Sequence, residues 1–254
     1  MPITIKSERE IELMTEAGRI LGIVHKELEK ALKPGMSTLD IDALGEEVIR
    51  SYGCEPSFLN YNGYPASICV SVNDEIVHGI PSAKHLIKEG DIVSLDAGVI
   101  YKGYHSDAAR THAVGEIRPD LQKLIDVTRE SFFEGIKFAK AGNHLFDISG
   151  AIGRYAEERG YGVVRDLCGH GIGTALHEAP EIPNYEVGRK GVRLRPGMTL
   201  AIEPMINIGT HEVDWLDDDW TVVTRDGSLS AHYENTILIT EGEPRILSLT
   251  CDNE

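Results

Sequence analysis

The chain carries the same pattern of landmarks twice, and this internal repeat limits its fold more than any other feature of the sequence. The landmarks are a glycine after one predicted helix, an Asp-Ile pair early in a second helix, and a glycine that ends that helix. They stand at Gly35, Asp40–Ile41 and Gly53, and again at Gly142, Asp147–Ile148 and Gly160, each 107 positions later. A shared offset over three landmarks indicates a duplication. The alternative is a coincidence between helices that end at glycines.

The same offset also pairs two acidic residues. It maps the apolar, strand-like run Gly90–Asp96 onto Gly197–Glu203, and each run follows a glycine turn and finishes at a carboxylate. Because the offset persists this far, duplication is favoured over coincidence. Asp96 and Glu203 are therefore predicted to be symmetry mates.

Each half is predicted to begin with helices and to continue with strands. Ser7 and Glu10 form a capping box before an apolar pattern of helical spacing, and a second helix is expected over about 39–52. Strands are expected at 68–72, 92–100, 199–208, 220–224 and 235–240. The second half carries some 20 extra residues around 211–226.

We expect one domain over residues 1–254, with repeat halves of roughly 1–115 and 116–254. Its predicted class is α+β, with helices on the outer face of a strongly curved sheet of mixed or antiparallel strands. A hydrophobic fraction of 41% is sufficient for a buried core.

Composition narrows the classes of partner and compartment. The net charge of −16 repels phosphate backbones, so DNA is not expected as a partner. No apolar run is long enough to cross a membrane and the first residues contain no signal-peptide core, so we expect a cytoplasmic protein. The four cysteines, Cys54, Cys69, Cys168 and Cys251, form no C-x-x-C pair, which fits a reducing compartment.

Four acids and one histidine form a candidate dinuclear metal site. Asp96 finishes one predicted strand and Asp107 begins or lines the next, so a hairpin would bring both to one edge. The second half supplies Glu203 and Glu234, and a pseudo-twofold axis would gather all four. Two divalent cations would balance their charge, and His170, on a glycine-rich loop, adds one nitrogen. This ligand set suits Mn, Fe, Co or Zn without choosing among them.

Taken singly, each of these acids is more often a turn former or a surface charge, so the prediction depends on the set. They lie among a series of short motifs: Gly63–Ser67, Asn73–Pro81, Asp96–Gly98, Tyr104–Asp107, Gly169–Gly173, His177–Pro180, Ile202–Met205 and Ser230–Thr236. These motifs resemble those of the type I methionine aminopeptidases. They occur in order and, with the intervening helices, cover nearly the whole chain. The resemblance implies the duplicated architecture called the pita-bread fold.

The resemblance also implies roles for the site residues. Asp96 and Asp107 are ligands of one metal, His170 and Glu203 serve the other, and Asp107 and Glu234 bridge the two ions. A hydroxide between the ions would attack the first peptide carbonyl, with Glu203 as proton shuttle. It further implies that His177 donates to the carbonyl oxygen and that His78 contacts the scissile amide. Without the resemblance, each histidine is more often a structural hydrogen-bonding group.

By the same resemblance, the methionine pocket maps onto Tyr61, Tyr64, Cys69, Leu176 and Trp220. The bland alternative is that these are core residues. Phe58 and Asn62 are the positions expected to alter the shape of the pocket, and Asn73 and Ser230 are candidates for a monovalent-cation site.

The predicted function is removal of the initiator methionine from peptides and nascent chains, with a small second residue preferred, by a monomeric enzyme. Alternatives are an X-Pro peptidase of the same fold or a non-catalytic binding module. The former generally carries a further N-terminal domain, and the latter is expected to lack metal ligands. A Cys168–His170 nucleophile pair is disfavoured, because neighbours in a glycine loop are poorly placed to hold each other. Association with the ribosome and the physiological metal are left open.

Overall fold

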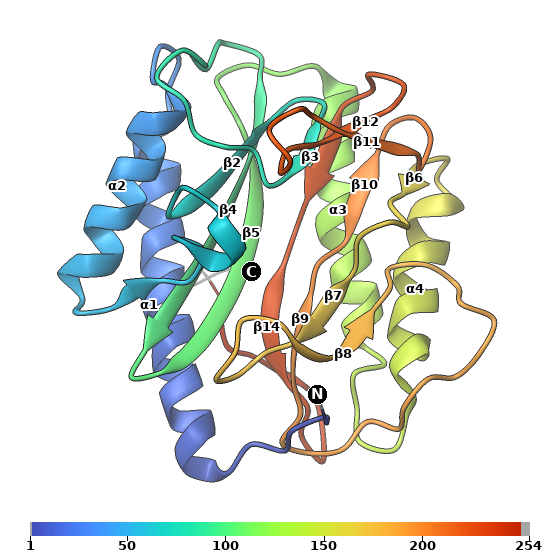
Figure 1. The fold of residues 1–254 in the computed structure, drawn as a ribbon. Helices are drawn as coiled ribbons and strands as arrows, with labels where there is room; N and C mark the ends of the chain where they lie inside the picture. Colours follow the sequence, from blue (N-terminus) through green and yellow to red (C-terminus); the bar gives the residue numbers. More distant parts are fainter. Residues whose placement is uncertain (1, 250–254) are drawn as a thin grey trace.

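The computed structural model describes residues 2–249, and its helices lie behind and beside the strands in Figure 1. They are α1 (Glu8–Ala31), α2 (Thr38–Ser51), α3 (Pro119–Ile136) and α4 (Leu145–Glu157). The capping box at the start of α1 forms as expected: the Glu10 N–H donates to the Ser7 hydroxyl, and the Ser7 N–H donates to the Glu10 carboxylate at 2.8 Å. The predicted order of two helices followed by strands holds in both halves.

The first half is built on a long hairpin. Strands β4 (Ile92–Tyr101) and β5 (Tyr104–Ala113) pair in antiparallel register from Ile92↔Ala113 to Tyr101↔Tyr104. On its other edge β4 pairs with β1 (Glu55–Pro56) and β2 (Ile68–Val72). Ten residue pairs in unbroken register give this hairpin a rigid face on which side chains can be placed.

The second half repeats the hairpin with a break in each strand. Strand β9 (Thr199–Ile202) pairs with β14 (Asn235–Leu238), and β10 (Met205–Asn207) pairs with β13 (Ser230–His232). The run expected as one strand over 199–208 is thus two strands. Pro204 stands at the break, and a proline has no N–H to continue a ladder of hydrogen bonds.

The two hairpins meet along a seam that β5 and β14 form in the middle of Figure 1. The Glu234 N–H donates to the Ala109 carbonyl at 2.9 Å. The Asp107 N–H donates to the Thr236 hydroxyl, which in turn donates to the Asp107 carbonyl, both at 2.9 Å. Backbone bonds therefore lock the halves together beside the residues of the predicted metal site.

The remaining strands extend these two hairpins. They are β6 (Gly162–Val163), β7 (Gly169–Gly171), β8 (Glu178–Ile182) and β15 (Arg245–Ile246), and a 3-10 turn spans Tyr61–Gly63. All pairings between these named strands are antiparallel, so the antiparallel form of the predicted sheet is correct.

The extra residues of the second half form a hairpin of their own. Strands β11 (Val213–Trp215) and β12 (Val222–Thr224) pair with each other, and β12 also pairs with β3 (Glu75–Val77) of the first half. The hairpin crosses from one half to the other. It therefore brings Trp220 to the first half's side of the molecule.

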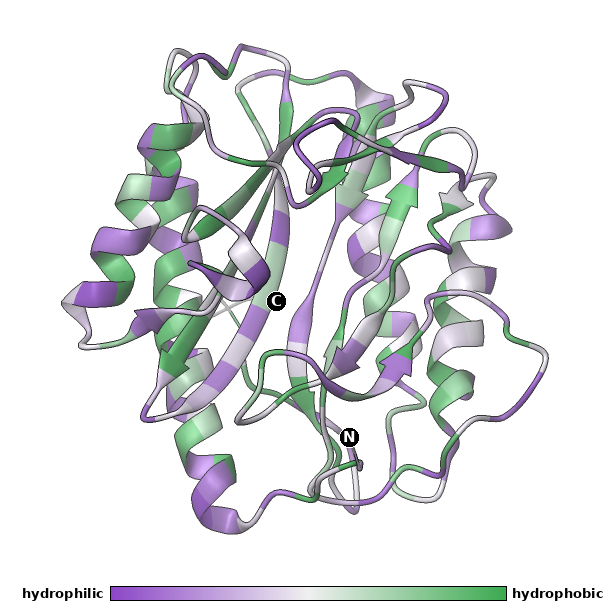
Figure 2. Cartoon of the chain, in the orientation of Figure 1, coloured by the Kyte–Doolittle hydropathy of each residue, from purple (hydrophilic) through white to green (hydrophobic). Residues whose placement is uncertain are grey.

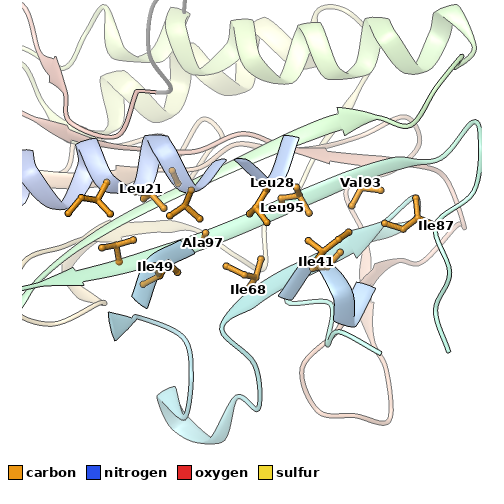
Figure 3. Packing of buried hydrophobic residues seen from close by; sticks show 14 of the residues in the cluster. Leu21, Leu28, Ile41, Ile49, Ile68, Ile87, Val93, Leu95 and Ala97 are labelled. Atoms are coloured by element: carbon orange, nitrogen blue, oxygen red, sulfur yellow. The ribbon is translucent and has the colours of Figure 1, made fainter. Parts of the chain in front are cut away.

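Each half has its own apolar core between helices and strands. In the first half, Leu21 and Leu28 of α1 pack on Leu95 and Ala97 of β4, as Figure 3 shows. The second half has a corresponding cluster around Phe132. Figure 2 shows hydrophobic and hydrophilic positions alternating along the helices, as expected when one face packs on strands. Among the described residues no helix is long and apolar enough to span a membrane.

Candidate metal centre and substrate pocket

Asp96 and Asp107 lie in the middle of the long hairpin. Asp96 stands opposite Ala109, and Asp107 stands opposite Gly98, so the two acids are diagonal neighbours on one face. The strand predicted over 92–100 is confirmed, whereas the expectation that Asp96 finishes a strand is wrong. The apolar run that the sequence presents before Asp96 is only the first half of a strand that continues to Tyr101.

Glu203 and Glu234 occupy the two breaks of the second hairpin. Glu203 follows β9 directly, as predicted, and Glu234 lies between β13 and β14. In a regular ladder, successive side chains alternate between faces. The breaks free both side chains from that alternation, so that both line the same pocket as Asp96 and Asp107.

His170 lies on a short strand rather than on the predicted loop. Strand β7 pairs with β9 at His170↔Ala201 and with β8 on its other side. The flanking glycines do permit the expected close approach: a Cβ on Gly169 would lie 2.4 Å from the Ala201 carbonyl oxygen, and one on Gly171 would lie 2.2 Å from that of Ala179.

The structure brings all five predicted metal ligands to one place. His170 Nε2 lies 3.6 Å from Glu203 Oε1 and 3.9 Å from Asp107 Oδ2. Ligand atoms of Asp107, His170 and Glu234 all lie within 4.8 Å of one another. Asp96, Asp107, His170, Glu203 and Glu234 together line one pocket of about 140 Å³.

The tautomer of His170 suits a metal ligand. Its Nδ1 lies 2.8 Å from the Gly171 carbonyl oxygen, which can only accept, so Nδ1 carries the proton. Nε2 then carries a lone pair, which faces the carboxyl groups. Burial and the neighbouring His177 lower the pKa of His170 to about 3, which keeps the ring neutral.

The four carboxyl groups cannot all be ionised without compensation. Burial first, and then the neighbouring acids, raise the pKa values of Asp96, Glu203 and Glu234 well above their ordinary range, and burial raises that of Asp107 to about 7. One oxygen each of Asp96, Asp107 and Glu234 is buried without a hydrogen-bond partner among the described residues. Acceptors without donors beside a proton-free imidazole nitrogen fit divalent cations.

The predicted methionine pocket is continuous with this cluster. The same 140 Å³ pocket is lined by the expected residues Tyr61, Tyr64, Cys69, Leu176 and Trp220, and also by Phe58 and Asn62. Cys69 stands opposite Asp96 in the pairing of β2 with β4, which sets the apolar wall directly beside the carboxylates.

The walls of the pocket are apolar although several of its residues carry polar groups. The Tyr64 hydroxyl donates to the Gly79 and Ile68 carbonyls, at 3.0 and 3.3 Å, so it is occupied within the protein. The Tyr64 ring packs edge-on against the Trp220 ring, with 5.1 Å between the ring centroids. Burial raises the pKa of the Cys69 thiol well above its usual value, so that side chain is neutral.

His177 and His78 also line the pocket. His177 Nδ1 lies 2.7 Å from the Tyr61 hydroxyl oxygen. The His177 ring packs edge-on against the His170 ring, with 4.3 Å between the ring centroids. Burial lowers the pKa of His177, and burial followed by the charge of His177 lowers that of His78 to about 4. Both rings are therefore neutral at pH 7.

One further histidine of this cluster was not predicted. His232 is buried, and its Nε2 lies 3.9 Å from Glu203 Oε2. Its position two residues before Glu234, inside the Ser230–Thr236 motif, is the one signal in the sequence that could have marked it.

The structure also bears on two further predictions, a monovalent-cation site at Asn73 and Ser230 and a nucleophile at Cys168. Asn73 and Ser230 are adjacent, since the Ser230 N–H donates to the Asn73 carbonyl at 2.9 Å, but the Asn73 amide already bonds Asp91 and Ile92. The cation site at these residues stays a prediction. Burial raises the pKa of Cys168 to about 11, which is unsuited to a thiolate nucleophile.

A larger cleft, of about 800 Å³, opens from the same cluster and was not predicted. Glu203, Asp166 and Glu181 are among the residues that line it. Phe146 and Arg189 also line it, with the guanidinium 5.4 Å from the ring centroid. The cleft and the smaller pocket share His78, His170, His177 and Glu203 in their linings.

Fold and site together define a metallopeptidase, and comparison with known proteins agrees. Residues 12–241 match the model of metallopeptidase family M24, so the chain belongs to that family. Among its relatives, methionine aminopeptidase of Clostridium acetobutylicum is 55% identical over 247 residues, which cover 97% of this chain and 99% of that protein. The predicted family resemblance is thereby confirmed.

Solved structures give the same result for the fold. Methionine aminopeptidase from Thermotoga maritima superimposes with a TM-score of 0.96 at 46% identity, covering 98% of this chain and 100% of that one. An Xaa-Pro dipeptidase from Bacillus anthracis has a TM-score of 0.79 at 28% identity, but only 63% of that chain is covered. The duplicated fold is shared with both, while the match in length is to the methionine aminopeptidases.

Proposed function

We propose that this chain removes the amino-terminal methionine from peptides and nascent proteins by metal-dependent hydrolysis, with preference for a small second residue. The observation that carries the proposal is the closed apolar pocket that ends at the carboxylate cluster. A pocket of about 140 Å³ has room for one side chain, and its walls suit an unbranched thioether. Nascent chains present such N-termini in the cytoplasm, which is the proposed compartment.

Asp96, Asp107, His170, Glu203 and Glu234 would hold two divalent cations of the manganese, iron, cobalt or zinc type. When bound, such cations supply Lewis acidity and lower the pKa of water towards neutrality. The proton-free His170 Nε2 and the carboxylate oxygens without donors support this assignment.

Glu203 is the proposed proton carrier. It lies at the junction of the closed pocket and the large cleft, where the bond between a first and a second residue would lie. In the metal-free chain, burial and the neighbouring Asp107 raise its pKa well above the ordinary value. Its carboxyl group is proposed to accept a proton and then to release it to the departing amine.

His177 is the proposed donor to the carbonyl oxygen. When its Nδ1 accepts from the Tyr61 hydroxyl, the ring carries its proton on Nε2. A donor fixed in advance stabilises the oxygen as negative charge develops there. His78 packs edge-on against Trp220, with 6.2 Å between the ring centroids, and is proposed to contact the scissile amide.

The test uses purified protein stripped with a chelator and supplied in turn with Mn, Fe, Co or Zn. Met-Ala-Ser should be cleaved only after a metal is restored, while X-Pro peptides and a matched Leu-Ala-Ser peptide should be cleaved far more slowly. Methionine release that survives complete metal removal, or a preference for X-Pro bonds, would refute the proposal.

A further inference from the structure

The segment that precedes α1, residues 2–7, is bonded to the second half of the chain. The Lys6 N–H donates to the Gly197 carbonyl at 2.8 Å, two residues before β9 begins. Figure 1 shows the segment leading from α1 towards the second half, where the N-terminus is marked. The segment therefore joins the first helix to the strands that follow His170 and precede Glu203.

Lys6 is a buried cation in this segment. Its side chain is 3% exposed, and its Nζ lies 2.8 Å from Oε2 of Glu178, whose side chain is 6% exposed. The Thr4 hydroxyl donates to the same oxygen at 2.7 Å. Burial alone would raise the pKa of Glu178, but the hydrogen bonds from Lys6 and Thr4 outweigh it and hold that pKa below its ordinary value. The ionised carboxylate therefore depends on the Lys6 ammonium for compensation.

The other carboxylate oxygen of Glu178 holds the turn that joins β7 to β8. Its Oε1 accepts from the Ala175 N–H at 3.3 Å, and the Gly173 N–H donates to the Ala175 carbonyl at 3.1 Å. Lys6 packs on the same turn, because a Cβ on Gly173 would lie 2.4 Å from Lys6 Cε and 2.5 Å from Glu178 Oε1. The lack of a side chain at Gly173 thus lets the ion pair lie directly against the turn.

This turn carries two residues of the substrate pocket, Leu176 and His177. Within residues 2–249, no backbone hydrogen bond holds either of them. The His177 ring is fixed on one side by the Tyr61 hydroxyl, 2.7 Å from Nδ1, and its backbone is followed directly by Glu178. The direction of the ring therefore depends on where Glu178 and the turn are held.

We propose that Lys6 is a positioning residue for His177, on which it acts through the Glu178 carboxylate and the turn of residues 172–177. This role rests on the proposed function, in which His177 donates to the carbonyl oxygen of the scissile bond. Lys6 itself lines neither the substrate pocket nor the large cleft. Its effect on turnover must therefore pass through the turn.

Steady-state kinetics on Met-Ala-Ser test the proposal with the metal-loaded full chain, in the parent and in His177→Ala, well below the unfolding temperature of each variant. Lys6→Met should lower kcat about tenfold in the parent and change KM by less than about threefold, because a small displacement of a donor weakens mainly the transition state. In His177→Ala the same substitution should leave kcat within about twofold, since the group through which Lys6 acts is gone.

Lys140→Met is the matched control. Lys140 Nζ lies 2.6 Å from Glu243 Oε1, but the two side chains are 39% and 76% exposed, and they line neither the substrate pocket nor the large cleft. Exposed ion pairs of this kind contribute little to stability. The variant should therefore turn over as its parent does, with or without His177.

The unfolding temperature separates positioning from a contribution to stability. It should fall in Lys6→Met by the same amount with and without His177, because the Glu178 carboxylate is left buried without its cation. Lys6→Met combined with Glu178→Gln removes both charges, so this double variant serves if Lys6→Met alone does not fold. The double variant should regain most of the unfolding temperature, while its kcat should stay about tenfold below that of the parent.

Nuclear magnetic resonance of the zinc-loaded chain gives a readout that needs no turnover. The His177 ring signals, assigned by their loss in His177→Ala, should shift in Lys6→Met and stay in place in Lys140→Met. A parent that releases no methionine with any metal would refute the proposed function, while these signals would still report on the turn. The positioning role is overturned if the His177 signals are unmoved in Lys6→Met, if the loss of kcat is equal with and without His177, or if the double variant regains full kcat.

Discussion

His170 Nε2 and an oxygen of the Glu203 carboxyl group face each other at 3.6 Å, and the imidazole nitrogen brings a lone pair to this contact. Nδ1 of His170 holds the ring proton, and it donates that proton to the Gly171 carbonyl. Asp107 adds a further oxygen at 3.9 Å from the same nitrogen. Lone pairs that converge in this way repel unless cations or added protons lie among them. The stability of the chain should therefore depend on metal and on pH together.

The metal-free chain should lose stability as pH rises from about 5 to 8. Asp107, with its pKa raised to about 7, and Asp96, whose pKa burial and Asp107 raise well above its ordinary value, hold protons in the folded chain that ordinary carboxyl groups release near pH 4. The folded state thus binds more protons than the unfolded state in this interval, so its free energy of unfolding falls with rising pH.

The measurement is thermal unfolding at several pH values after dialysis against a chelator, and again with saturating manganese. Saturating manganese should remove most of the dependence of the unfolding temperature on pH, because the metal-bound carboxylates are then ionised at every pH tested. Metal-free protein whose unfolding temperature stays level or rises over this interval would contradict the raised pKa values.

Glu203→Gln should lower kcat by about 100- to 10,000-fold, the usual contribution of a positioned general acid or base. The amide nearly preserves the size of the side chain but cannot carry a proton between groups. Circular dichroism and unfolding temperature should show an intact fold. Glu212→Gln is the control, since Glu212 is an exposed partner of Arg225 on the β11–β12 hairpin, and it should turn over normally. Full activity in Glu203→Gln would remove Glu203 from the mechanism.

Tyr61→Phe should reduce kcat by roughly fivefold, the effect of one lost hydrogen bond of about 1 kcal/mol. The phenol fixes the His177 ring at 2.7 Å and thereby keeps the proton on the nitrogen that faces the substrate. His177→Ala should cost more, and adding Tyr61→Phe to it should change little, because both variants act through one ring. Steady-state kinetics on Met-Ala-Ser measure all three, and strictly additive losses would show that Tyr61 acts separately.

The duplication and the identity of the clustered acids could be predicted from the sequence, because both depend on spacing and on short apolar runs within the chain. The offset that relates Asp96 to Glu203 requires only counting, and the apolar runs before them are visible without any knowledge of pairing. Figure 1 shows the two hairpins that these runs become, β4 with β5 and β9 with β14.

Features that depend on partners distant in sequence were not predicted correctly. The strand predicted over 92–100 is correct, but the expectation that Asp96 finishes it is wrong, and the pairing of its second half with β1 was not predicted. His170 was expected on a loop, yet pairing with β9 and β8 makes its segment a strand. Such bonds lie between segments that are far apart in the chain, so local propensity cannot specify them.

Trp220→Leu should raise KM for Met-Ala-Ser by about 10- to 100-fold, since the loss of contact around one apolar side chain is worth about 1–3 kcal/mol. Trp220 supplies one wall of the pocket and packs on Tyr64 at 5.1 Å. Trp215→Leu is the control, because Trp215 lies on the same hairpin but is 52% exposed and does not line the pocket. An equal rise in KM for both variants would show that the hairpin, rather than its tryptophan, determines binding.

Gly171→Ala should weaken both the fold and metal binding. A methyl group there would lie 2.2 Å from the Ala179 carbonyl oxygen, so β7 and β8 must separate, and the carbonyl that orients His170 moves with them. Strain of this kind costs about 1–3 kcal/mol, or roughly 2–12 °C of unfolding temperature for a chain of this size. Gly242→Ala is the matched control, because nothing lies within 4 Å of a Cβ at that position. The unfolding temperature and the manganese affinity, measured by titration, should both fall for Gly171→Ala and not for Gly242→Ala. A stable Gly171→Ala variant with unchanged manganese affinity would show that β8 can move without disturbing His170.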